Sequence, residues 1–179
     1  MSEKFEINSE LSDYPNFDNF KDTIRKVRTK FQELFGLNEL YRIPLFIDNS
    51  TAGSGHTPNC SVVLQKYITI KLNIADFNRT EQITYQFAHE MTHFMYRCYI
   101  GINKKSAGVY EESMCSAMSL CFLYNNCRNF ESWCEHVRKL TNEGYRKGYD
   151  VALACKFNPE KLRDKILAEM NSYRRVALP

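Results

Sequence analysis

The sequence has no hydrophobic run long enough to cross a membrane, and no apolar stretch follows its first basic residue. We therefore expect neither a membrane partner nor a secretory signal. The net charge is only +3, and the lysines and arginines are scattered, which argues against nucleic acid as a partner. The sequence contains neither an internal repeat nor a low-complexity tract.

The chain also lacks any Cys-x-x-Cys pair, although it has seven cysteines. An odd number of cysteines without an export signal is typical of reduced thiols, so we predict a cytoplasmic protein. We expect most of these cysteines to be small core residues.

What the sequence does contain is a composition typical of soluble globular proteins, with 44% hydrophobic and 25% charged residues in a chain of 179. Residues 1–16 are polar and are expected to be loose, and residues 17–179 are expected to form a single domain. Hydrophobic periodicity predicts an α+β fold, in which a small, mostly antiparallel sheet is followed by the helix of the candidate site and by further helices. The expected strands are 41–48, 60–64 and 66–73, and the expected helices are 17–35, 79–99, 109–125, 131–147 and 158–173.

Residues 89–93 read His-Glu-Met-Thr-His, inside a helix with an apolar stripe. Residues four apart lie on the same helix face, so His89 and His93 can both bind one metal ion. Glu90 is turned by about 100° from His89 and can reach a metal-bound water without being a ligand itself. This spacing is what a hydrolytic Zn²⁺ site requires.

The following predicted helix begins with two glutamates, Glu111 and Glu112, among mostly apolar residues. A carboxylate in such surroundings is costly unless it is paired or bound to metal. Two neutral imidazoles and one carboxylate would leave a zinc site with a net charge of +1, which acidifies a bound water toward a pKa of about 7. The sequence therefore supplies a third ligand for Zn²⁺, with either glutamate in reach.

His-Glu-x-x-His followed by a glutamate on the next helix resembles the gluzincin clan of zinc metallopeptidases, over about residues 60–125. The resemblance implies a zincin-like fold and cleavage of peptide or protein substrates. Its spacing favours Glu112 over Glu111 as the third ligand. Gluzincins often have an acidic residue one turn later, which orients the first histidine, and here that position is Ser116.

The resemblance also implies a substrate-binding edge strand and an oxyanion donor. The edge strand would be Lys66–Asn73, with Tyr67, Thr69 and Lys71 on its exposed face. Tyr145 is the first choice for the oxyanion donor, and the other candidates are Tyr110, His136 and Tyr149.

Two rival functions remain open. The chain could be a zincin-like regulatory or interaction module whose zinc is closed by four protein ligands, with Cys115 as a candidate fourth ligand. A helical protein with a chance motif would bind no metal at all. The substrate, the choice between internal and terminal cleavage and the oligomeric state stay open.

Overall fold

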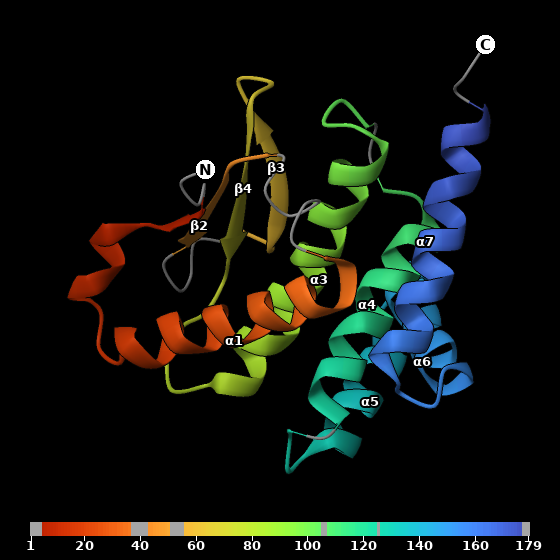
Figure 1. The fold of residues 1–179 in the computed structure, drawn as a ribbon. Helices are drawn as coiled ribbons and strands as arrows, with labels where there is room; N and C mark the ends of the chain where they lie inside the picture. The colour runs from red at the N-terminus through yellow and green to blue at the C-terminus, as the bar shows by residue number, and fades with distance from the viewer. Residues whose placement is uncertain (1–4, 37–42, 51–55, 105–106, 125, 177–179) are drawn as a thin grey trace.

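The computed structural model describes residues 5–36, 43–50, 56–104, 107–124 and 126–176. These residues form a four-stranded mixed sheet, a short 3₁₀ helix and six α-helices, so the fold is α+β (Figure 1). The elements are β1 (Phe5–Ile7), η1 (Ser9–Asp13), α1 (Phe17–Phe35), β2 (Leu45–Asn49), β3 (Asn59–Val63), β4 (Tyr67–Leu72), α3 (Thr80–Ile100), α4 (Val109–Tyr124), α5 (Phe130–Lys139), α6 (Glu143–Ala154) and α7 (Pro159–Val176).

The sheet has the strand order β1-β2-β4-β3. The expectation of a mostly antiparallel sheet is wrong, because β2 pairs in parallel with both β1 and β4, and only β3–β4 is antiparallel. The chain crosses from β1 to β2 through α1, the kind of long connection that parallel neighbours need. The tight turn between β3 and β4 is made by Leu64 and Gln65, both at positive φ.

Within the N-terminal segment, residues 5–7 form strand β1 and residues 9–13 form the short helix η1. Phe5 lies opposite Leu45 in the parallel β1–β2 pair, and Leu11 is 4% exposed. The side chain of Asn8 caps η1 and also donates a hydrogen bond to Asp48 at 3.0 Å. The polar composition of this segment gives little indication of the short strand, which pairs with β2 and packs Phe5 against the core.

The central element of the fold is α3, which lies between the sheet and the remaining C-terminal helices (Figure 1). One face of β4 carries Ile68, Ile70 and Leu72, each fully buried in the core that α1 and α3 share. On its other side α3 packs along α4, whose residues from 113 to 123 are all buried. Among the described residues, no helix is both long enough and apolar enough to cross a lipid bilayer.

The helix predicted over 131–147 is instead two helices, α5 and α6. The break falls at Leu140–Asn142, where the Asn142 side chain accepts hydrogen bonds from the backbone of Gly144 and Tyr145 at 2.8 and 3.3 Å. Asparagine is a strong N-cap residue, and it starts a new helix within a pattern that otherwise looks continuous.

Candidate metal centre

The motif residues lie in the middle of α3, where the helix is enclosed by the sheet and by α4. His89 and Glu90 are each 3% exposed, and the side chain of His93 is 12% exposed. The two imidazole rings face the same side of the helix, with their centroids 5.0 Å apart. A buried, converging histidine pair of this kind matches the predicted placement.

Glu112 on α4 reaches both imidazoles. Its Oε2 atom lies 3.2 Å from Nε2 of His89, and its Oε1 atom lies 3.5 Å from Nε2 of His93. Each histidine thus faces a different oxygen of the same carboxylate. Imidazole nitrogens and carboxylate oxygens are the donor atoms that zinc accepts, so the chemistry of His89, His93 and Glu112 is compatible with a bound metal ion.

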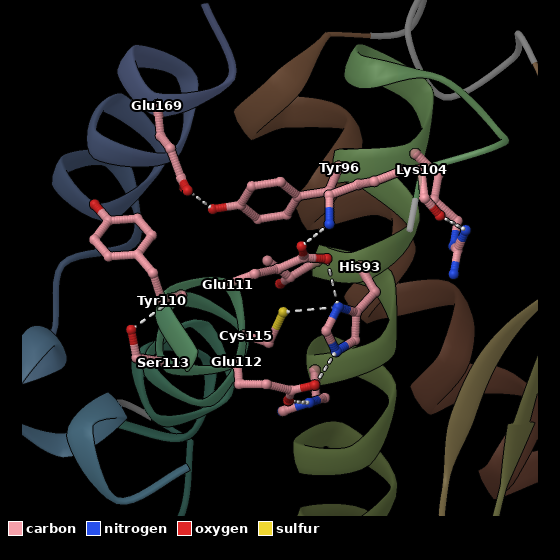
Figure 2. A network of polar contacts seen from close by, with 12 residues as sticks. His93, Tyr96, Lys104, Tyr110, Glu111, Glu112, Ser113, Cys115 and Glu169 are labelled. Carbon is pink, nitrogen blue, oxygen red and sulfur yellow. Dashed lines mark hydrogen bonds and ion pairs between the residues drawn. The ribbon is translucent and has the colours of Figure 1, made fainter. Parts of the chain in front are cut away.

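Glu111 lies on the opposite side of His93. Its Oε1 atom is 2.9 Å from Nδ1 of His93, and its other oxygen accepts a hydrogen bond from Lys104 (Figure 2). A carboxylate on Nδ1 favours the tautomer that leaves Nε2 free for a metal. Sequence reasoning treated Glu111 only as a rival ligand, whereas in the structure it contacts Nδ1 of His93.

Cys115, one turn after Glu112, is fully buried and offers a second ligand set. Its Sγ atom lies 3.4 Å from Nδ1 of His93, and ligand atoms of His89, His93 and Cys115 all lie within 4.8 Å of one another. This thiol approaches the same ring nitrogen that Glu111 contacts. Burial raises the pKa of Cys115 to about 12, so without a metal ion the group is a thiol at neutral pH, and binding to zinc would require the loss of its proton.

The pKa values of two glutamates at the centre, Glu90 and Glu112, are shifted in opposite directions. Burial raises the pKa of Glu90, and the two histidines oppose this shift only in part. Burial also disfavours ionisation of Glu112, but hydrogen bonds from His89 and His93 outweigh it and lower the pKa of that carboxyl. Two carboxylates in one site thus have opposite tendencies, so Glu90 accepts a proton more readily than Glu112 does.

His93 is itself a proton-binding group in this arrangement. Burial lowers its pKa, but the neighbouring Cys115, Glu111 and Glu112 together raise it well above the ordinary value. A histidine must be neutral to bind a metal ion. Protons therefore compete with a metal for this residue.

Tyr145 lies against the first histidine, as its ring stacks on that of His89 at 4.8 Å and 10°. The glycines of α6 allow this approach. A Cβ added to Gly144 would lie 2.5 Å from Cβ of Glu112, and one added to Gly148 would lie 2.4 Å from Cβ of Ser116. Larger residues at these two positions would force α6 away from α4 and would separate the Tyr145 ring from His89.

The surroundings of His89 differ from the expected pattern. Its Nδ1 atom has no hydrogen-bond partner among the described residues, and neither does the Ser116 hydroxyl at the position where gluzincins often have an orienting acid. His89 is therefore held by the contact of its Nε2 atom with Glu112 and by the stacked Tyr145 ring, and not by a partner on Nδ1. Burial raises the pKa of Tyr145 to about 12, so its hydroxyl remains a proton donor at neutral pH.

The other oxyanion candidates are engaged or lie elsewhere. Tyr110 is 51% exposed. The ring of Tyr149 packs under the guanidinium of Arg138 at 4.9 Å. His136 packs edge-on to Trp133 at 6.0 Å, at a cavity beside the site.

The strand expected to bind substrate is not at an edge, because β4 lies between β2 and β3. Tyr67, Thr69 and Lys71 occupy the face of β4 that points away from the core. Tyr67 packs against Phe46 at 5.1 Å, and Lys71 pairs with Asp48 at 3.9 Å. Among the described strands, β3 is the edge strand beside the candidate site, and its Cys60 lines the same cavity as Glu90.

Two cavities adjoin the candidate site. The smaller, of about 180 Å³, includes His93, Glu111 and Glu112 among its walls. The larger, of about 530 Å³, extends from His89 toward α5. Glu90 and Tyr145 line both cavities, so the motif glutamate faces open space on two sides.

Comparison with known proteins finds no relative of this chain. No protein-family model matches the chain, and searches of curated proteins and of solved structures give no match.

Proposed function

We propose that this protein is a zinc-dependent peptidase with a zincin-like fold, in which His89, His93 and Glu112 bind Zn²⁺. The observation that carries this proposal is the approach of one Glu112 carboxylate to Nε2 of both histidines, at 3.2 and 3.5 Å. Three protein ligands with a cavity beside them fit a catalytic zinc site, which keeps one position for water. All seven cysteines are free thiols, which supports the further proposal of a cytoplasmic location.

Each nearby side chain has a defined part in the proposed reaction. Zinc would supply a Lewis acid that polarises a peptide carbonyl and activates a water. Glu90 accepts the proton of the attacking water and passes it to the leaving amine, a role that suits its raised pKa. The protonated hydroxyl of Tyr145 donates a hydrogen bond to the developing oxyanion.

The open edge of β3 is the proposed place for the peptide backbone. An extended peptide can add to a free strand edge through main-chain hydrogen bonds. Pro58 precedes this strand and lines both cavities, and Cys60 lines the smaller one with Glu90. A peptide bound along β3 would therefore pass beside Glu90.

The experiment compares the wild-type protein with Glu90→Gln, using Glu135→Gln on the exposed face of α5 as the matched control. Zinc content is measured by elemental analysis, and hydrolysis with a pool of quenched fluorogenic peptides. Glu90→Gln should keep its zinc and lose hydrolysis by about 100-fold or more, whereas Glu135→Gln should match the wild type. Equal hydrolysis by Glu90→Gln and wild type would refute the mechanism.

A zinc-binding regulatory module is the second candidate, and the closeness of Cys115 to His93 favours it. In that case Cys115 would close the site as a ligand and no peptide would be cleaved. Cys115→Ser separates the two functions, because a catalytic site should keep its zinc in this variant and a thiolate-closed site should lose it.

A further inference from the structure

The larger cavity beside the candidate site has features that select a particular kind of side chain. Its volume of about 530 Å³ lies within the range of small-molecule sites. His89, Glu90 and Tyr145 form its inner end, and α5 forms its outer wall. A side chain that enters it from a peptide on β3 would therefore belong to a residue near the scissile bond.

Aromatic rings line this cavity. Tyr85, one turn before His89 on α3, stacks on Trp133 of α5 at 4.9 Å and 24°. His136 adds a ring edge-on to Trp133. Trp133 is only half-buried and lines the cavity, so part of its indole remains available to a ligand. Aromatic faces and edges favour other aromatic rings through offset-stacked or edge-on contacts.

Charge at the cavity disfavours a basic side chain. Among the described residues that line it, Glu90 is the only carboxylate and Arg79 is the only lysine or arginine. A lysine or arginine side chain of a substrate would find no acidic partner apart from Glu90, and would meet Arg79. Burying an unpaired charge is costly, whereas an apolar ring gains free energy on burial.

We infer that this cavity is the specificity subsite of the protein and takes a large aromatic side chain of the peptide, with Trp133 as its main contact. The inference rests on the proposed peptidase function, because it assigns the substrate class of that site. It predicts that peptides with phenylalanine, tyrosine or tryptophan next to the cleaved bond bind more tightly than peptides with lysine there.

The chain contains a single tryptophan, so fluorescence excited at a wavelength that tyrosine does not absorb reports on Trp133 alone. The zinc-loaded wild-type protein, which keeps Glu90, is titrated with end-blocked, non-cleavable tetrapeptide analogues that are identical except for one central residue, phenylalanine or lysine. The phenylalanine peptide should change the Trp133 emission and bind at least about tenfold more tightly than the lysine peptide. Equal affinities, or saturation without a change in emission, would overturn the inference.

A filled cavity provides the second test. Ser132 is an exposed residue at the cavity, so Ser132→Phe should occupy the space without disturbing the core. Glu135→Ala on the same helix, outside the cavity, is the matched control. By calorimetry, Ser132→Phe should remove the preference for phenylalanine over lysine, and Glu135→Ala should retain it. A full preference in both variants would place the aromatic side chain elsewhere and refute the assignment.

The two proposals fail in different ways. Hydrolysis of the peptide pool by the wild-type protein with no preference for the phenylalanine peptide would overturn this subsite and leave the peptidase function intact. A selective fluorescence change without hydrolysis by the wild-type protein would overturn the peptidase function and leave the aromatic subsite standing.

Discussion

His89 and His93 lie one turn apart on α3, yet they are held by different kinds of contact. Nδ1 of His93 faces Glu111 and Cys115, and Lys104 pairs with Glu111 (Figure 2). Nδ1 of His89 has no hydrogen-bond partner among the described residues, and its ring is stacked on Tyr145. Glu112 contacts Nε2 of both histidines, so the two differ on the Nδ1 side of the ring: charged and polar partners hold His93 there, whereas His89 has only the packing of Tyr145 on its ring.

The charged side of the centre continues outward as a network. Lys104 lies over the ring of Tyr96 at 5.7 Å, and the Tyr96 hydroxyl donates a hydrogen bond to Glu169 on α7 (Figure 2). The affinity of His93 for a metal should therefore respond to pH and to charge changes. The contribution of His89 should respond to the shape of the contact with α6. Substitutions can test this difference through zinc affinity.

The largest effect is expected from Glu112, because it is the one carboxylate among the described residues that contacts both histidines. Glu112→Ala should weaken zinc binding by more than about 100-fold, since loss of a residue that only orients a ligand already costs about 10- to 100-fold. Competition with a chromogenic chelator measures the affinity, with Glu135→Ala as the control. Wild-type affinity in Glu112→Ala would exclude it as a ligand.

Glu111→Gln should have the next largest effect, a loss of about 10- to 100-fold in zinc affinity. The amide can still contact Nδ1 of His93 but cannot carry the charge that supports the imidazole. The same chelator assay measures this loss. A loss as large as that of Glu112→Ala would exchange the roles of the two glutamates.

The pH dependence of zinc affinity tests the contact between Glu111 and His93 further. His93 has a raised pKa in the metal-free protein, so below that pKa zinc must displace a proton. Zinc affinity should then fall about tenfold for each pH unit of acidification and level off above that pKa. In Glu111→Gln one of the groups that raise the pKa is weakened, so the fall should begin at lower pH. Superimposable pH profiles for the two proteins would show that Glu111 does not act on His93.

The smallest effect on zinc affinity is expected from substitutions of Tyr145, which contacts His89 through packing of the rings. Tyr145→Leu removes the stacked ring and should weaken zinc binding by about two- to tenfold. Tyr145→Phe keeps the ring and should leave zinc affinity unchanged, while it lowers peptide hydrolysis by about tenfold or more. Reduced zinc affinity in Tyr145→Phe, or full hydrolysis by it, would argue against the hydroxyl as an oxyanion donor.

The sequence predicted those features that depend on local spacing. His89 and His93 are four residues apart on one helix, and the two glutamates open the next helix, which is apolar along most of its length and therefore expected to pack against the first. The placement of Glu111 on Nδ1 of His93 was not predictable, because it depends on the rotation of α4 against α3. The only sequence feature that reflects the close approach of α6 to α4 is the pair of glycines at 144 and 148. This signal is not specific, because glycines also occur in helices at caps and kinks.

The strand order of the sheet was harder to predict, because it too depends on contacts between segments that are distant in the sequence. Ile68, Ile70 and Leu72 alternate with polar residues, which correctly indicates one buried face of β4. Alternation says nothing about neighbours, so the pattern could not show that β4 lies between β2 and β3. The short strand β1 has almost no local sequence signal. The whole of α1 separates it in the sequence from its partner strand β2.

The most direct test of the proposed metal centre is zinc K-edge X-ray absorption on the zinc-loaded protein. Ligation by His89, His93, Glu112 and water predicts one zinc per chain, surrounded only by nitrogen and oxygen atoms at about 2.0–2.2 Å. A sulfur neighbour at about 2.3 Å would place a cysteine, Cys115 or Cys60, in the coordination sphere and contradict the open site that hydrolysis requires. Failure to bind zinc stoichiometrically would contradict the metal centre itself.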